Sequence, residues 1–95
     1  MMVYAVLILD LRLSGCRSLK EKRGNIKPIL NRLHKEFNVS SAEIEKNDCW
    51  NESVIACGLI TNEKKAADAQ LNQILHFMEN HWRNIDIINY SITYL

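Results

Sequence analysis

The sequence is poor in the residues that interrupt regular structure. Its 95 residues include three glycines and one proline. So small a number excludes a glycine- or proline-rich linker and a low-complexity segment, and no internal repeat of the length typical of solenoid proteins is found. With a hydrophobic fraction of 47%, the chain is expected to form a single folded domain over residues 1–95.

Long hydrophobic runs are also missing. The longest covers residues 4–9 and ends at Asp10, which is too short for a transmembrane helix. The first residues lack the basic segment and the small-residue cleavage site of a secretory signal. Three cysteines, an odd number, make a poor disulfide framework. We therefore expect a cytoplasmic protein that has no membrane partner.

Motifs for metal, nucleotide or nucleophilic chemistry are absent as well. Cys49 and Cys57 form no Cys-x-x-Cys pair, and His76 and His81 fall on different helical faces. The glycine spacing and Lys-Ser/Thr ending of a Walker A loop are missing. Cys16 precedes a predicted helix beside cations, which lowers a thiol pKa, but no histidine is near it in sequence to act as a base. We predict no cofactor, no metal and no catalytic residue.

What the sequence does contain is an uneven distribution of charge. The net charge is only +1. Residues 17–36, however, carry seven basic and two acidic side chains, so that segment is +5 and the rest of the chain is −4. A positive surface on an otherwise acidic protein is typical of contact with phosphate groups. The simpler interpretation is a solvated helix face.

Periodicity predicts the elements of the first half. Val3–Leu13 has apolar residues at every second position, which indicates a central strand with one buried face. Ser18 and Glu21 have the spacing of a capping box. The apolar residues of the helix that follows share one stripe: Leu19, Ile26, Ile29, Leu30, Leu33 and Phe37. Pro28, four residues after Gly24, predicts a kink in this helix or two short helices.

The second half continues with a weak strand over Val39–Glu45, which suits a sheet edge, and a turn over residues 46–51. Val54–Ile60 predicts a buried strand. Asn62 is expected to cap a second helix whose inner face carries Ala67, Leu71, Ile74, Leu75, Met78 and Trp82. The last strand is expected to place these residues on one face: Ile88, Tyr90, Ile92 and Tyr94.

The predicted order of elements is strand-helix-strand-strand-helix-strand. This order indicates an α+β domain of the ferredoxin-like βαββαβ class, with a four-stranded antiparallel sheet and two helices on one face. The class hosts unrelated functions, so function has to be inferred from sites.

The cations of the first helix lie mostly along one flank, beside its apolar stripe. The start of the helix adds free backbone amides and the positive end of the helix dipole, which favour anions. The candidate anion- and nucleic-acid-binding residues are Arg17, Lys20, Lys22, Arg23, Lys27 and Lys35. Phosphate contacts position a nucleic acid but do not read its bases, so no sequence recognition is implied.

The sheet face away from the helices is predicted to be apolar. Residues 53–61 contain no aromatic and no basic residue, which disfavours base stacking of the kind seen in RNA-recognition domains. The first strand presents Tyr4, Val6 and Ile8 there instead, and such a face suits a second copy of the chain. We therefore expect these three residues in a homodimer interface. Trp50, in a polar turn, is either a contact residue or folds over the core; we favour the core.

Residues 13–23, Leu-Ser-Gly-Cys-Arg-Ser-Leu-Lys-Glu-Lys-Arg, resemble the signature of the YlxP-like family of small bacterial proteins of unknown function. Residues 37–44 and the Asp48-x-Trp50 turn agree with it, whereas Gly24 and Pro28 depart from it. The resemblance implies a ferredoxin-like fold and no established activity. Genes of that family often lie between those of translation initiation factor two and ribosome-binding factor A, which suggests a partner in translation or ribosome assembly.

Three functions follow from these observations. The leading hypothesis is a non-enzymatic protein that contacts ribosomal RNA or the ribosome through the first helix. The first alternative is a protein-interaction adaptor or homodimer without nucleic acid, whose basic helix meets an acidic partner. The second is an acylphosphatase-like hydrolase: Gly15 and Arg17 stand where that family has its phosphate loop, but its water-orienting asparagine and its loop sequence have no match here.

Overall fold

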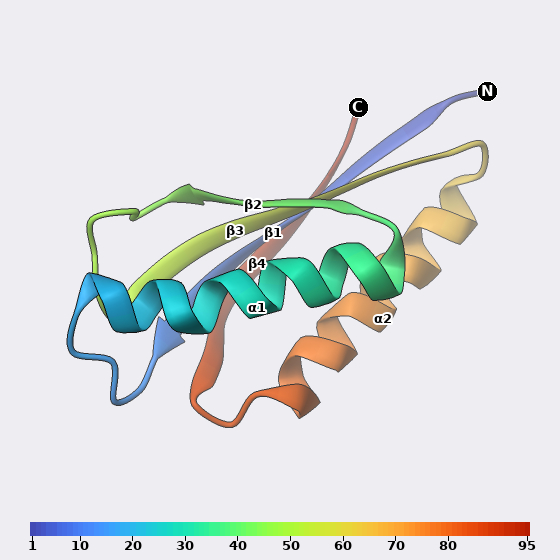
Figure 1. Cartoon of the computed structure of the whole chain (residues 1–95). Coiled ribbons are helices and arrows are strands. Elements are labelled where there is room, and N and C mark those ends of the chain that lie inside the picture. The colour runs from blue at the N-terminus through green and yellow to red at the C-terminus, as the bar shows by residue number, and fades with distance from the viewer.

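The four strands form one antiparallel sheet in the order β2-β3-β1-β4. The strands are β1 (Val3–Leu13), β2 (Ser40–Glu45), β3 (Glu52–Thr61) and β4 (Ile85–Tyr94). The helices, α1 (Leu19–Phe37) and α2 (Lys64–His81), both lie on one side of the sheet (Figure 1). The computed structural model describes all residues from 1 to 95, and its architecture confirms the predicted ferredoxin-like βαββαβ fold.

β1 lies in the middle of the sheet, and its side chains alternate between two surroundings. The odd-numbered residues from Val3 to Leu13 are all buried, whereas the even-numbered ones are exposed or half-buried. The buried set packs against the inner faces of the helices in one core, which includes Ile26, Ile29, Leu33, Leu71, Ile74 and Met78. The period-two pattern therefore predicted both the strand and its buried face.

α1 begins as its capping sequence predicts. The Ser18 hydroxyl accepts a hydrogen bond from the Glu21 backbone amide at 3.1 Å, and the Glu21 carboxylate accepts one from the Arg17 amide at 2.9 Å. The helix ends at Asn38, whose φ of 49° is left-handed, a conformation that asparagine tolerates at helix ends.

α1 also continues through Pro28, where the sequence predicts an interruption. It is a single helix from Leu19 to Phe37 and is drawn as one nearly straight ribbon in Figure 1, so the expected kink or division into two helices is wrong. Pro28 and Gly24 lie on the exposed side, where water can hydrate the carbonyl that loses its partner. Ile26 and Ile29 are buried on either side of the proline and hold the helix on the sheet.

α2 begins one residue later than predicted. Glu63 is the N-cap residue in place of Asn62, and its side chain makes no capping hydrogen bond. Trp82 lies just beyond the helix and is half-buried against the core. The other predicted inner-face residues are buried: Ala67, Leu71, Ile74, Leu75 and Met78. Neither helix is long and apolar enough to span a membrane.

A bulge in β4 changes which of its residues face the helices. Asp10 pairs with Asn89 and Leu11 pairs with Ile87, so Ile88 is an extra residue. Such an insertion shifts the period-two pattern by one residue, so Ile87 joins the face of Tyr90, Ile92 and Tyr94, which the alternation predicted without it. The residues opposite the buried residues of β1 are Ile85, Ile87, Tyr90, Ile92 and Tyr94.

Lys22 of α1 is the largest buried polar side chain, with 1% of it exposed. Its Nζ lies 3.0 Å from Oε2 of Glu43 on β2. The same carboxylate oxygen accepts a hydrogen bond of 2.5 Å from the hydroxyl of Ser53 on β3. A buried charge is stable only when it is paired and hydrogen-bonded, and this ion pair meets that condition while it connects three elements.

The Lys22 ammonium also binds the loop between β2 and β3. It donates to the carbonyl oxygens of Lys46 at 2.7 Å and of Asn47 and Glu52 at 3.3 Å. The loop carbonyls thus surround the positive charge, and the loop is fixed against α1. We call this set the Lys22 network: Lys22, Glu43, Ser53 and the carbonyls of Lys46, Asn47 and Glu52.

Replacing Lys22 by methionine is expected to destabilise the protein strongly. Removing one partner of a buried ion pair costs up to about 3–5 kcal/mol, because the remaining charge of Glu43, whose side chain is 17% exposed, stays mostly buried and unpaired. Urea unfolding followed by circular dichroism measures the change. Lys20→Met, two residues away on the exposed side of the same helix, is the matched control and should change the free energy of unfolding little. Equal effects of the two substitutions would contradict the structural role of Lys22.

Candidate anion-binding surface

Five cationic side chains of α1 and the loop before it are exposed: Arg17, Lys20, Arg23, Lys27 and Lys35. None of them forms an ion pair, since the three ion pairs of the structure belong to Lys22, Arg32 and Lys46. Lys20, Arg23 and Lys27 are spaced by three and four residues and therefore lie on one side of the helix. We call these three residues the basic face of α1.

The structure removes Lys22 from the predicted anion-binding set. Its ammonium is enclosed by the Glu43 carboxylate and three carbonyl oxygens, so its donors are used within the protein. The sequence contains a signal for this. Lys22 has helical spacing with the buried residues Ile26, Ile29 and Leu33, and so belongs to the apolar stripe and not to the flank.

Arg32 is directed toward α2 and adds nothing to the basic face. Its guanidinium lies 2.6 Å from a carboxylate oxygen of Glu36 and 3.1 Å from Nε2 of His81. It also lies over the ring of Phe77, 5.4 Å from the centroid. This part of the positive charge of residues 17–36 therefore connects the two helices.

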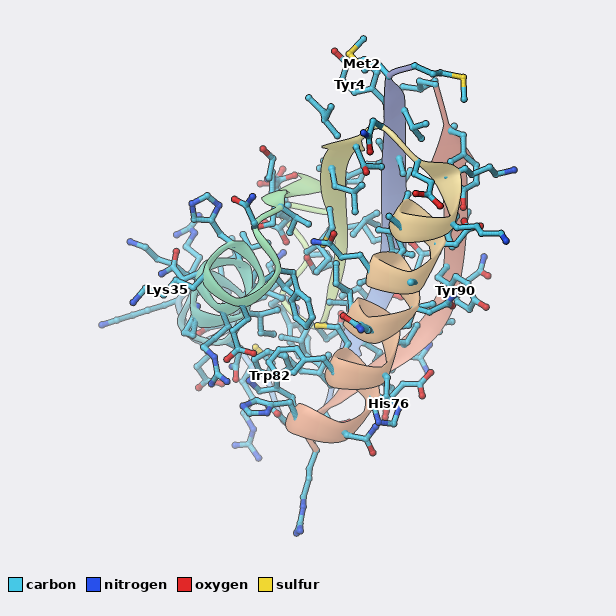
Figure 2. The ribbon with its side chains drawn as sticks, turned by 90° about the vertical axis from the view of Figure 1, so that its right-hand side faces the viewer. Met2, Tyr4, Lys35, His76, Trp82 and Tyr90 are labelled. Atoms are coloured by element: carbon cyan, nitrogen blue, oxygen red, sulfur yellow. The ribbon has the colours of Figure 1, made fainter.

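Lys35 extends the positive charge to the far end of α1. Figure 2 shows its side chain on the outer side of the helix, pointing away from α2, whereas Trp82 lies on the side between the helices. At 1.5 Å per residue, Lys20 and Lys35 are about 22 Å apart along the helix axis. This length is sufficient for contact with several successive phosphates of one strand.

A shallow crevice between α1 and β2 runs beside the basic face. One part is lined by Arg23, Ile26, Lys27, Leu30 and Glu43, together with Lys22. The adjoining part shares Lys27 and Leu30 and adds polar residues from both elements: Asn31, His34, Ser40 and Ser41. We call the two parts together the α1–β2 crevice. The carboxylate of Glu43 is its one anionic group, and that charge is paired with Lys22.

Trp50 lies outside the core, which corrects the preferred sequence interpretation. Its side chain is 47% exposed, and it does not belong to the buried cluster. The loop that carries it is fixed by the Lys22 network and by a hydrogen bond of 2.9 Å from the Leu13 amide to the Asn51 carbonyl. An exposed tryptophan on a fixed loop is a feature that sequence reasoning missed; its polar neighbours were the available signal.

The predicted interface residues Tyr4, Val6 and Ile8 occupy the sheet face opposite the helices, as their even positions in β1 require. Tyr4 is 40% exposed, and the other two are half-buried. No group of three or more histidine, cysteine, aspartate or glutamate side chains is arranged to hold a metal ion.

The three cysteines are free, and they differ in accessibility. Cys16 is 5% exposed, and its thiol is directed to the Ser18 carbonyl oxygen at 3.6 Å. Burial raises the pKa of the Cys57 thiol to about 12, so almost none of it is thiolate at neutral pH. Cys49 is only half-buried.

Thiol titration with a chromogenic disulfide reagent at pH 8 is expected to detect Cys49 alone in the folded protein. The reagent reacts with accessible thiolates, which Cys16 and Cys57 do not present. All three cysteines should react in denaturant, and Cys49→Ser should abolish the native signal. Rapid native labelling of Cys16 would contradict its burial and would support a reactive role at the start of α1.

Solved structures similar to this chain share its fold. A de novo designed protein, Foldit4, matches with a TM-score of 0.60 and 15% identity over 100% of this chain and 97% of the other. A de novo designed protein with a ferredoxin fold matches with a TM-score of 0.59 and 11% identity, over 100% and 84% of the two chains. A third structure, protein YJCS, has a TM-score of 0.52 and 9% identity over 95% and 96%. At these identities, the likeness concerns the fold alone.

Sequence comparison gives the kinship. The Uncharacterized protein YlxP of Bacillus subtilis (strain 168) is 33% identical over 63 residues, which cover 66% of this chain and 68% of that protein. The family model described as "Protein of unknown function (DUF503)" matches residues 4–92, nearly the whole chain. The resemblance noted from residues 13–23 is thereby confirmed, and the chain belongs to the YlxP-like family DUF503.

Proposed function

We propose that this protein binds RNA through phosphate contacts made by the basic face of α1, with ribosomal RNA as the first candidate. The observation that carries the proposal is the set of exposed cations on α1 that have no carboxylate partner. Such cations lose little on binding an anion, because no internal ion pair has to be broken first.

The free energy of binding comes largely from the release of counterions. Each phosphate neutralised by a lysine or arginine releases condensed cations from the nucleic acid, so affinity falls steeply as salt rises. These contacts hold the backbone and carry no base specificity. The proposed activity is thus salt-dependent RNA binding with little sequence preference.

The α1–β2 crevice supports the proposal with polar groups beside the cations. Asn31 is exposed there, and its amide is able to donate to phosphate or sugar oxygens. His34 has its Nδ1 bound to the Val39 carbonyl at 2.9 Å, which fixes the ring at the crevice wall. An RNA backbone that lies along α1 would therefore have hydrogen-bond donors on one side and positive charges along its length.

The opposite face of the sheet is unsuited to the same role. Its charged end carries Asp10, Glu52 and Asp86 around a single cation, Arg12. Carboxylates repel phosphates, so an approaching RNA is directed to the helix side of the molecule. The choice of ribosomal RNA rests on the gene neighbourhood of the family and not on the geometry.

Reversing the charges of the basic face tests the proposal. We expect Lys20→Glu, Arg23→Glu and Lys27→Glu, combined, to abolish most binding to in vitro transcribed small-subunit ribosomal RNA. At about 0.7 per single-strand contact, loss of three contacts should lower the slope of log affinity against log salt by about 2. Fluorescence anisotropy at several salt concentrations measures both quantities.

A matched variant separates the site from net charge. Lys64, Lys65 and Arg83 are exposed cations outside α1 without ion pairs, and their reversal to glutamate changes the total charge equally. That variant should retain most of the affinity and of the salt slope. Equal loss in both variants would mean non-specific attraction, and no binding of the wild type at low salt would refute the proposal. An interaction with an acidic protein that survives RNase would favour the adaptor alternative.

A further inference from the structure

The sheet face that the helices leave uncovered is divided sharply by charge. Backbone pairing places its side chains in five rows that cross the strands. The first three rows contain only uncharged residues: Ile60, Tyr4 and Leu95; Ser40, Gly58, Val6 and Thr93; Ala42, Ala56, Ile8 and Ser91. The last two rows contain five charged residues: Glu45, Asp10, Glu52, Arg12 and Asp86. We call the first three rows the neutral patch.

The neutral patch is mostly apolar, and its first row is well exposed. Ile60 is 64% exposed, Tyr4 is 40% exposed and Leu95 is 77% exposed. It lies at the end of the sheet where the two termini meet (Figure 1), and Figure 2 shows Tyr4 beside Met2 at that end, far from Trp82 and His76. Large apolar side chains gathered in this way on one surface mark a site of contact with another molecule.

The charges around the patch narrow the choice of partner. No lysine or arginine lies within the three neutral rows, and the adjoining two rows have four carboxylates and one arginine. Neither a nucleic acid nor an anionic lipid surface would be attracted to such a face. A second copy of the same uncharged surface would meet it without any like-charge contact.

We infer that this protein forms a homodimer in which the neutral patches of two copies pack face to face. A two-fold axis that crosses the strands at Val6 gives a self-complementary contact, as symmetric dimers require. Val6 then meets Val6 of the second copy, and Tyr4 of each copy lies over Ile8 of the other. The same axis moves the two acidic ends to opposite sides of the dimer, where they do not repel each other.

The size of the patch limits the area that the dimer buries. Strand spacings of about 4.8 Å and a rise of about 3.3 Å per residue make the patch roughly 19 by 16 Å, or about 300 Å² in projection. The accessible area is larger, because the side chains stand above the sheet. Two copies in contact cover about 600 Å² in projection, and the standing side chains raise the buried accessible area toward the lower limit of about 1,000 Å² for specific interfaces.

The dimer leaves the helices free. Both copies of the basic face of α1 point away from the contact, since the helices cover the other side of each sheet. The inference therefore goes beyond RNA binding and does not depend on it.

Sedimentation velocity over a wide range of protein concentrations tests the inference. The wild type should pass from monomer to dimer with rising concentration, whereas Ile60→Glu, a charge placed in the neutral patch at a well-exposed site, should remain a monomer. Ile88→Glu is the matched control, because Ile88 is half-exposed at the β4 bulge and outside the patch, and it should dimerise as the wild type does. Circular dichroism confirms that each variant is folded.

Val6→Cys tests the position of the axis. Sheets packed face to face lie about 10 Å apart, which is too far for a disulfide. In a Cys49→Ser background, a short bis-maleimide should therefore join the two introduced thiols across the axis into a covalent dimer. Lys65→Cys, on exposed helix surface, should give none. A wild type that is monomeric at every concentration, or an association that Ile60→Glu leaves unchanged, overturns the inference. A monomeric wild type would indicate that a different protein contacts the neutral patch.

Discussion

The ion pair between Lys22 and Glu43 is the interaction on which the arrangement of the surface depends. It joins α1 to β2, and through the carbonyls of Lys46, Asn47 and Glu52 it holds the loop between β2 and β3. A helix whose Lys22 points into the protein must direct outward the residues that lie about 100–160° around its axis from Lys22. The rotation of α1 about its axis is thereby set, and Lys20, Arg23 and Lys27 are left facing water.

This constraint explains why neighbouring lysines have different roles. Lys20 and Lys22 belong to the same short run of the sequence, yet one is exposed and the other is 1% exposed. An ammonium surrounded by a carboxylate and three carbonyls is satisfied electrostatically and has no donor left for a ligand. An exposed lysine without a carboxylate partner keeps all of its donors. The buried lysine stabilises the fold, and the exposed lysines form the surface that we propose for RNA binding.

The two proposals use opposite sides of the molecule and different physical forces. On the helix side, unpaired cations favour a polyanion, and binding weakens with salt. On the sheet side, uncharged rows favour removal of apolar surface from water, which salt does not weaken. A dimer formed through the sheets would present two basic helices outward, and a ligand that reaches both would bind more tightly than to one.

Sequence periodicity predicted the order of the elements, because it reports burial directly. It was correct for β1, where six alternate residues are all buried, and for the start of α1. It failed at two places where contacts between elements outweigh the local sequence pattern. Pro28 does not divide α1, since packing on both sides outweighs one lost hydrogen bond, and the bulge at Ile88 is set by pairing with β1.

The candidate site was predicted in part, for a similar reason. The cations were identified from charge, but the burial of Lys22 depends on Glu43 and on loop carbonyls distant in the sequence. The α1–β2 crevice likewise forms only because β2 packs beside α1, and the hydrophobic pattern of the sequence does not predict that contact. Trp50 was misplaced because no sequence pattern shows whether a loop residue turns inward.

The division between a structural and a binding lysine is tested most directly by NMR of the lysine ammonium groups during titration with RNA. The account predicts that the Lys22 ammonium gives a slowly exchanging signal that RNA does not move, whereas the signals of Lys20 and Lys27 shift on binding. A Lys22 signal that exchanges as rapidly as the others, or that shifts together with them, would contradict it.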